Sequence, residues 1–163
     1  MEIIIRDVDK SNWEDVTDLE LEATQEAFVA SNAYSLAEAA YEEFCTPKAI
    51  YYGELLIGFS MYESLESENL PNEYMICRLM IDKDFQKKGY GRAALKKIIS
   101  IISNIRDCEK IKICYDPKNP VAKRFYSSFG FVEVGIEDGE IIAEIDVVKT
   151  PKAFNAGMHN KPL

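Results

Sequence analysis

Hydrophobic positions along the chain follow two periods, and their order predicts the fold class. Short β-branched or alternating apolar runs predict strands, and apolar residues three or four positions apart predict helices. The predicted strands span residues 3–5, 48–52, 55–62, 74–81, 110–115, 131–134 and 141–147, and the predicted helices span 12–28, 35–44, 91–105 and 121–129. The resulting order, β-α-α-β-β-β-α-β-α-β-β, predicts an α/β protein with a mixed sheet and helices on both faces, unlike a doubly wound nucleotide-binding fold.

A few capping and turn residues set the predicted boundaries. Ser35, with Glu38 three positions later, is typical of a capping box at the start of the second helix, and Pro47 is expected to end that helix. The pair 53–54, Gly-Glu, predicts a tight hairpin, and Gly130 predicts the end of the last helix.

The pattern also predicts how the chain divides. Residues 74–81 are almost continuously apolar, which is typical of a strand buried on both faces. No linker or repeat interrupts residues 1–149, so these are predicted to form a single domain. Residues 150–163 contain two prolines and little periodicity, which predicts a loosely held C-terminal tail.

A turn with two glycines joins strand 74–81 to the helix that follows. Glycine at 89 and 91 permits positive φ and removes the Cβ atoms that would hold an anion away from the main chain. The helix N-terminus adds free N–H groups and the positive end of its dipole. The turn consists of Gln86, Lys87, Lys88, Gly89, Tyr90, Gly91 and Arg92, and its three cationic side chains also favour an anion such as a pyrophosphate.

A second motif follows at a fixed distance and narrows the identity of that anion. Its residues are Asn119, Ala122, Tyr126, Gly130 and Phe131. A Rossmann site would need G-x-G-x-x-G and a Walker A loop would need G-x-x-x-x-G-K-[ST], and neither pattern is present. The glycine turn therefore belongs to another kind of anion site.

The two motifs together resemble those of the GNAT superfamily of acyl-CoA-dependent N-acetyltransferases, an EC 2.3.1 class. The resemblance covers residues 3–147 and implies a GNAT-like central, mostly antiparallel sheet of six to seven strands. It implies that the anion is the pyrophosphate of acetyl-CoA, bound by the N–H groups of residues 87–92. No metal is expected.

The resemblance also assigns roles around the cosubstrate. Strands 74–81 and 110–115 would splay apart, and the main chain of Leu79, Met80 and Ile81 would pair with the pantetheine arm. Asn119 and Ala122 would contact the cosubstrate, and Tyr126 would give a proton to the departing CoA thiolate. Taken alone, Asn119 equally fits a helix-capping or turn residue before Pro120, and Tyr126 fits an ordinary half-buried aromatic residue better than a catalytic one.

Residues 25–39 are similar to bacterial spermidine/spermine and diamine acetyltransferases, in which a two-helix insert covers the acceptor amine. The resemblance implies a polyamine acceptor held by carboxylates through charge-assisted hydrogen bonds. The candidate substrate-binding residues are Glu22, Glu26, Tyr34, Glu73 and Cys77. Cys77 stands where animal-type relatives carry an acid that accepts the amine proton, so the general base is left unassigned between Glu73 and a bound water.

Composition narrows the classes of partner. The formal net charge of −9 makes nucleic acid a poor partner. Acidic residues dominate 1–74 and basic residues dominate 75–130, so one part of the chain suits a cation and another a polyanion. No run approaches the roughly 20 apolar residues of a membrane span, and the N-terminus does not resemble a secretion signal.

Cysteine and histidine usage points to a reducing compartment. Four cysteines without C-x-x-C spacing and a single histidine, His159, predict neither a disulfide framework nor a metal site, which fits a cytoplasmic protein. A homodimer is expected from the resemblance. Two other functions stay open: an N-acetyltransferase for a protein N-terminus or an aminoglycoside-type amine, and a non-catalytic acetyl-CoA-binding module.

Overall fold

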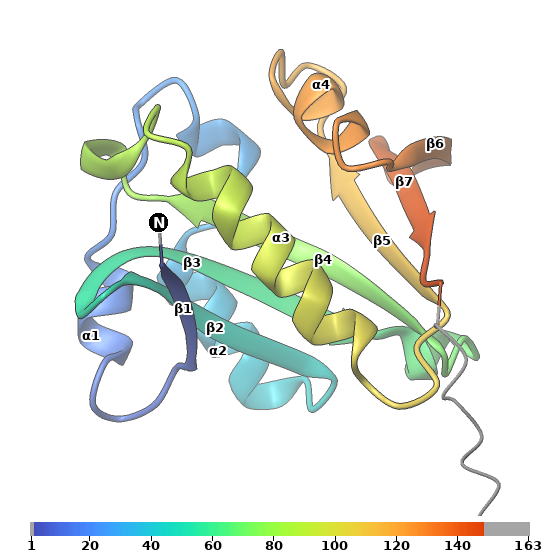
Figure 1. The fold of residues 1–163 in the computed structure, drawn as a ribbon, viewed down its shortest axis with the longest axis horizontal. Helices are drawn as coiled ribbons and strands as arrows, with labels where there is room; N and C mark the ends of the chain where they lie inside the picture. Colours follow the sequence, from blue (N-terminus) through green and yellow to red (C-terminus); the bar gives the residue numbers. More distant parts are fainter. Residues whose placement is uncertain (1, 149–163) are drawn as a thin grey trace, which may run out of the picture.

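The structure is a computed structural model that describes residues 2–148, and it has a seven-stranded sheet with helices on both faces (Figure 1). The strands are β1 (Ile3–Asp7), β2 (Cys45–Tyr52), β3 (Leu55–Ser64), β4 (Glu73–Ile81), β5 (Lys110–Tyr115), β6 (Val132–Glu137) and β7 (Glu140–Asp146). The helices are α1 (Trp13–Thr17), α2 (Asn32–Tyr41), α3 (Tyr90–Ser103) and α4 (Ala122–Ser127), with 3-10 helices η1 (Glu26–Phe28), η2 (Leu65–Glu68) and η3 (Lys83–Phe85). The predicted order of strands and α-helices is confirmed.

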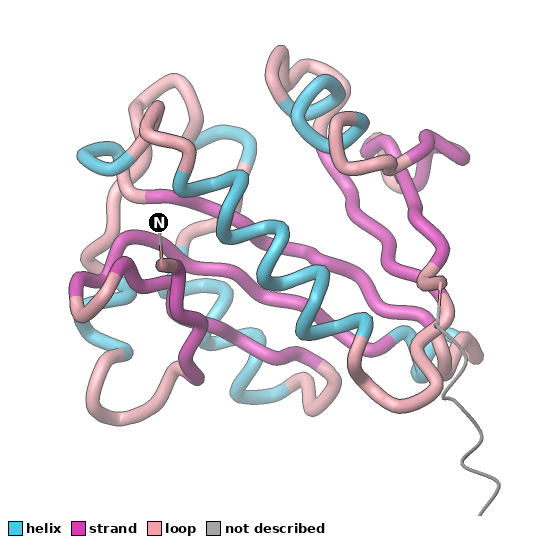
Figure 2. Tube along the Cα trace, viewed as in Figure 1, coloured by secondary structure: helices cyan, strands magenta, loops and turns pink. Residues whose placement is uncertain are grey.

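The sheet is mixed because one pair of strands is parallel. Its order is β1-β2-β3-β4-β5-β7-β6, and β4 with β5 is the parallel pair. The pairing of β4 with β5 ends at Ile76 and Ile113, although β4 continues to Ile81 and β5 to Tyr115. The two strands therefore separate at their C-terminal ends, which divides the upper part of the sheet (Figure 2).

Each face of the sheet has its own hydrophobic core. On one face, α3 contributes the fully buried Leu95, Ile98 and Ile102, which follow the predicted helical stripe. On the other face, α1 contributes the fully buried Val16, which packs near Phe59 of β3. Figure 1 shows α3 in front of the sheet and α1 and α2 behind it. Helices on both faces, as predicted, are confirmed.

The first predicted helix, over 12–28, is wrong beyond Thr17. The chain after α1 instead makes backbone contacts with the connection between β4 and α3. The Glu20 N–H donates to an Asp82 carboxylate oxygen at 2.9 Å, and the Lys83 N–H donates to the Glu20 carbonyl at 2.8 Å. These long-range bonds replace helical ones, so tertiary contacts override the helical spacing of the apolar residues.

The second helix starts earlier and ends earlier than predicted. Ser31, not Ser35, caps α2 by accepting the Tyr34 N–H at 3.1 Å. Pro47 does not end the helix but lies within β2. It is tolerated there because β1 pairs with β2 only from Lys48 onward, so the missing N–H of proline leaves no ladder bond unmade on that side.

Strand β4 is not buried on both faces as predicted, because most of its residues are half-buried. Its C-terminal half loses β5 as a neighbour, and the side chains there border a cavity. The predicted tail, residues 150–163, lies outside the described residues. Across residues 2–148, no helix is long and apolar enough to span a membrane.

Candidate active site

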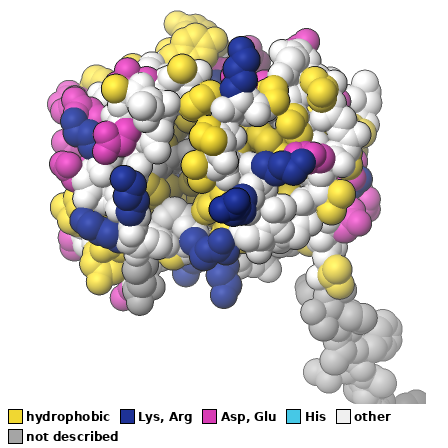
Figure 3. Space-filling model, turned by 90° about the horizontal axis from the view of Figure 1, so that it is seen from above, with side chains coloured by type: hydrophobic (Ala, Val, Ile, Leu, Met, Phe, Trp, Pro, Cys, Tyr) yellow, Lys and Arg dark blue, Asp and Glu magenta, His cyan; other side chains and the backbone are white. Residues whose placement is uncertain are grey.

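A cavity of about 1120 Å³ opens where β4 and β5 separate. Its walls come from the segment 24–30, the C-terminal half of β4, the glycine turn, the end of β5 and α4. Figure 3 looks onto this end of the molecule and shows a hollow with hydrophobic side chains inside it and basic side chains near its rim. One cavity thus brings together both sequence motifs and part of the predicted amine-binding segment.

The glycine turn places free backbone donors beside the cavity. Gly89 has φ +82° and is the N-cap of α3, and Lys87 has φ +60°. Among the described residues, no acceptor binds the backbone N–H groups of residues 87–92, and the first bonded N–H is that of Ala93, to the Gly89 carbonyl. Gly91 does not adopt the positive φ that glycine permits, because it lies in the first turn of α3.

The cations of the turn do not all face the cavity. Lys87 and Arg92 line it. Arg92 donates to the Ser128 hydroxyl at 2.7 Å and lies over the Phe129 ring. Lys88 does not line the cavity, and its ammonium donates to the Asp84 carbonyl at 2.8 Å.

Two residues of the turn, Gln86 and Tyr90, make contacts that stabilise the fold. Gln86 lines the cavity but uses its amide to donate to the Ile81 carbonyl at 2.9 Å and to Gln25 at 2.8 Å. Those bonds join the turn to the end of β4 and to the segment 24–30. Tyr90 lies outside the cavity lining, with its ring centroid 5.1 Å from that of Tyr52.

Strand β4 carries an extra residue at the point where the strands separate. Met61 of β3 pairs with Arg78, whereas Tyr62 pairs with Ile76, so Cys77 is bulged out of the ladder. Leu79, Met80 and Ile81 then line the cavity along the unpaired edge of β4.

Arg78 connects this bulge to α2. Its guanidinium donates to the Cys77 carbonyl at 2.8 Å, to the Ser35 hydroxyl at 3.2 Å and to the Glu38 carboxylate at 3.2 Å. Ser35 and Glu38 are three residues apart, so they lie on one face of the helix. This contact explains why Ser35 is fully buried inside α2 rather than capping it.

Tyr126 lines the cavity from α4. Its ring stacks on Tyr115 of β5 with centroids 5.7 Å apart and meets Phe131 edge-on. Burial, with a smaller contribution from Cys114, raises the pKa of the Tyr126 hydroxyl to about 12. The phenol is therefore neutral, and a proton donor, throughout the physiological pH range.

Asn119 lies just before α4 and has a structural role as well as a place in the cavity wall. Its side-chain oxygen accepts the N–H groups of Val121 at 3.1 Å and Ala122 at 3.2 Å. Asn119 therefore acts as a turn residue before α4, whose N-cap is Val121. Asn119 and Ala122 both line the cavity, and no acceptor within residues 2–148 binds the Asn119 amide nitrogen.

Two cysteines line the cavity at the point of separation, and the Cys77 thiol donates to the Met61 carbonyl at 3.3 Å. Cys77 and Cys114 each follow directly after the last paired residues of β4 and β5. Burial is the main cause that raises the pKa of both thiols, to about 12 for Cys114 and further for Cys77. Neither thiol is ionised near neutral pH, so neither is an activated nucleophile or base.

The candidate amine-binding residues divide into two groups. Glu26 and Cys77 line the cavity, whereas Glu22, Tyr34 and Glu73 do not. Glu73 lies at the opposite end of β4, where its carboxylate is 2.7 Å from the Lys112 ammonium, and Tyr34 is exposed on α2.

Two charged residues of the cavity wall were missed as site residues by the sequence reasoning. These are Arg78 and Glu140, the first residue of β7. The signal for Glu140 was its alternation with Ile142, because that spacing places both side chains on one face of the strand. The pairing of β7 with β5 was needed before that face could be assigned to the cavity.

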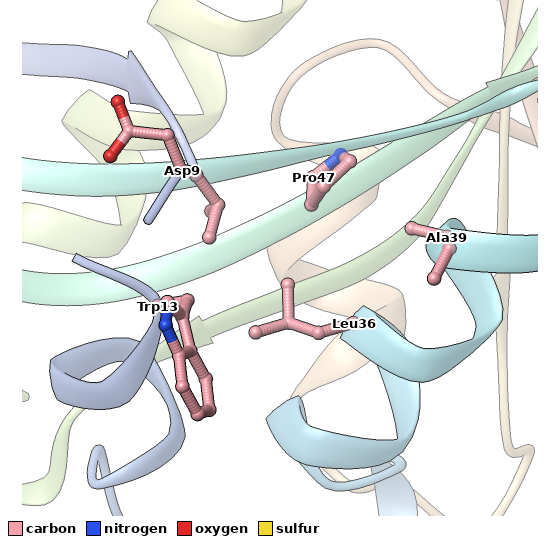
Figure 4. Close-up of a pocket in the computed structure, with 7 residues that line it drawn as sticks. Asp9, Trp13, Leu36, Ala39 and Pro47 are labelled. Carbon is pink, nitrogen blue, oxygen red and sulfur yellow. The ribbon is translucent and has the colours of Figure 1, made fainter. Parts of the chain in front are cut away.

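A second, smaller hollow of about 310 Å³ lies between α1, α2 and β2. Figure 4 shows Trp13, Leu36 and Pro47 around it, with the Asp9 carboxylate turned away. That carboxylate accepts the Ser11 N–H at 2.7 Å and the Ser11 hydroxyl at 2.6 Å. This hollow offers an apolar wall without reactive groups. Within residues 2–148, no cluster of side chains suited to hold a metal ion is found.

The fold is similar to that of two acetyltransferases of known structure. An aminoglycoside acetyltransferase AAC(6′)-Ib in complex with coenzyme A superposes with a TM-score of 0.75 at 17% identity, covering 89% of this chain and 95% of that one. Spermidine N-acetyltransferase from Vibrio cholerae, in complex with CoA and spermine, superposes with a TM-score of 0.70 at 16% identity and the same coverage. The predicted GNAT-like fold is confirmed.

Sequence comparison identifies the family. The model of the acetyltransferase (GNAT) family matches residues 13–131, so this chain belongs to the GNAT family of acetyltransferases, an EC 2.3.1 class. The chain is 30% identical over 134 residues to the probable spermine N(1)-acetyltransferase of Bacillus subtilis subsp. natto (strain BEST195), covering 80% of this chain and 88% of the relative. It is 29% identical over 134 residues, with the same coverage, to the spermine/spermidine N(1)-acetyltransferase of Bacillus subtilis (strain 168).

Proposed function

We propose that this protein transfers the acetyl group of acetyl-CoA to a primary amine of a polyamine such as spermidine or spermine. The observation that carries the proposal is the separation of β4 and β5 above Ile76 and Ile113, with Tyr126 and the glycine turn on the resulting cavity. The polyamine acceptor is supported by the two similar bacterial proteins named for spermine or spermidine acetylation.

The residues of the cavity fit acetyl-CoA as cosubstrate. The N–H groups of residues 87–92 have no acceptor among the described residues, and Lys87 and Arg92 add positive charge. An anion such as a pyrophosphate would supply the hydrogen-bond acceptors that these N–H groups lack. The unpaired edge of β4 from Cys77 to Ile81 can accept an extended amide-containing arm as an added strand. Acetyl-CoA would bring the activated thioester.

Direct attack of the amine is the mechanism that the side chains favour. The cavity offers the two thiols of Cys77 and Cys114, and both stay protonated, so an acetyl-cysteine intermediate is disfavoured. Tyr126 would protonate the departing thiolate, because its own pKa of about 12 keeps the phenol neutral.

The acceptor must lose a proton before it attacks. An alkyl ammonium of pKa about 10.4 is neutral in only about one molecule in 2,500 at pH 7. Glu73 is displaced from the cavity and paired with Lys112, so it is a poor candidate for that base. A bound water remains the candidate for this role.

The test is CoA release measured across a panel of amines: spermidine, spermine, putrescine, lysine, an aminoglycoside and short peptides. We expect CoA release with spermidine or spermine to exceed that with peptides. Residues 24–30 line the cavity, and an acceptor bound beside them would be a small amine more readily than a peptide. Preference for peptides or aminoglycosides would support the corresponding alternative.

The panel also tests the remaining class of function. Acetyl-CoA binding without CoA release on any amine would identify a non-catalytic binding module.

We further propose that the enzyme is a homodimer, to be checked by sedimentation. A single catalytic domain over residues 1–149 is proposed as well, in agreement with a family match over 13–131.

A further inference from the structure

We propose that Glu140 is a specificity-determining residue that binds an ammonium group of the acceptor. The inference rests on the proposed function and extends it to a residue outside both sequence motifs. Glu140 opens β7, directly after the turn at Asp138 and Gly139, and its side chain lines the cavity.

The sheet register places Glu140 on the side of the cavity that contains Cys114 and Tyr126. Ile142 of β7 pairs with Cys114 of β5, and Glu140 lies on the same face as Ile142, two residues away. The carboxylate of Glu140 interacts with the Cys114 thiol, and Cys114 in turn is close enough to affect Tyr126. A chain of neighbours therefore connects Glu140 to the proposed proton donor.

Several cations on β4, β5 and α4 are paired with acids other than Glu140. Arg78 pairs with Glu38 at 3.2 Å. On β5 and α4, Lys123 pairs with Glu133 at 3.0 Å, Lys110 with Glu144 at 2.6 Å and Lys112 with Glu73 at 2.7 Å. Among the described residues, no cation forms an ion pair with Glu140.

The positions of the carboxylates in the cavity wall indicate which kind of ligand would bind there. Of the described carboxylates, only Glu26 and Glu140 line the cavity, and they lie on different walls. An acceptor with more than one ammonium can place its reacting amine beside Tyr126 while a second ammonium contacts Glu140 through a charge-assisted hydrogen bond. A monoamine lacks this contact, so Glu140 favours polyamines over monoamines.

The experiment compares Glu140→Gln with Glu137→Gln, a matched control. Glu137 lies directly opposite Glu140 in the β6–β7 hairpin but does not line the cavity, and both changes remove one negative charge. Calorimetry gives the Kd of spermidine for each protein saturated with CoA. We expect E140Q to weaken spermidine binding about tenfold, the range of one lost charge-assisted bond at an exposed site. E137Q should stay within about twofold of wild type.

Steady-state kinetics supply the second readout. E140Q should raise the KM for spermidine, leave the KM for acetyl-CoA unchanged and leave the KM for butylamine unchanged. Equal effects of E140Q and E137Q, or an equal rise in all three KM values, would overturn the role of Glu140. Spermidine binding that depends on Glu140 without any acetyl transfer would instead refute the proposed function while retaining this site.

Discussion

At the scale of single residues, Tyr126 is the side chain on which the proposed chemistry depends most. Its ring packs against Tyr115 and Phe131, and the residue lines the cavity. Among residues 2–148, no hydrogen bond to the Tyr126 hydroxyl is found, so the hydroxyl can bind a substrate atom. Burial then keeps that hydroxyl protonated.

We expect Tyr126→Phe to lower kcat about 100-fold or more, because general acid catalysis contributes about 10²–10⁴-fold. KM values should change little, because only the hydroxyl is removed. In wild type, kcat/KM for the amine should rise from pH 7 to 9 as the ammonium deprotonates. It should not fall before pH 10, since a pKa of about 12 keeps the phenol protonated there.

The pH profile separates catalysis from packing. A Tyr126→Phe enzyme with wild-type kcat would exclude Tyr126 as the acid. A fall in activity below pH 10 that disappears in the phenylalanine variant would show instead that the phenol ionises at its ordinary pKa.

For single residues, the sequence predicted some members of the cavity wall correctly but did not predict where others lie in the fold. It singled out Asn119 and Tyr126 by spacing, and both line the cavity. It could not place Glu73 or Glu140, because which face of a strand meets a cavity depends on the neighbouring strands. Glu73 lies at the far end of β4, and Glu140 enters the cavity only through the pairing of β7 with β5.

At the scale of elements, a substitution in the first turn of α3 can test ligand binding without disturbing the fold. Gly89 is in the left-handed region and needs glycine, whereas Gly91 is helical. A Cβ at Gly91 would have as its nearest neighbour the Ile81 side chain at 3.6 Å, an ordinary contact. The protein itself therefore has room for alanine at this position.

We expect Gly91→Ala to fold with an unchanged or slightly higher Tm, because alanine favours a helix by up to about 1 kcal/mol over glycine. Its affinity for acetyl-CoA should fall about 10–100-fold, since a Cβ would separate the pyrophosphate from the backbone donors. Thermal unfolding and a titration with CoA measure the two effects. Unchanged CoA affinity would place the anion elsewhere.

Local signals predicted some element boundaries and failed at others. β5 and the stripe of α3 follow directly from their own apolar residues. α1 is shorter than predicted because the backbone of Glu20 bonds to Asp82 and Lys83. α2 starts early because its buried face must present Ser35 and Glu38 to Arg78. Both failures come from partners about 40–60 residues away in the chain.

At the scale of the whole molecule, the separation of β4 from β5 shapes the site. The two parts of the sheet are joined by only four paired residues on each strand, from Glu73 to Ile76 and from Lys110 to Ile113. Beyond them, the facing edges lack the strand-to-strand hydrogen bonds that hold the rest of the sheet together.

Amide hydrogen exchange followed by mass spectrometry tests this arrangement. Without ligand, we expect faster exchange in residues 77–81 than in residues 73–76, because only the latter pair with both neighbours. Added CoA should slow exchange in residues 77–81 and 87–92 but not in β1. Protection spread evenly over the whole sheet would argue against a ligand lying in the opening.

The sequence by itself determined the order of elements and pointed to the glycine turn as a candidate anion site and to Tyr126 as a candidate acid. These depend on local periodicity, on backbone freedom at glycine and on side-chain chemistry, all of which are encoded within short stretches. Only the tertiary structure decided that β4 and β5 part after Ile76, that Glu73 leaves the site and that Glu140 joins it. Those outcomes depend on register between distant strands, which no short stretch of sequence contains.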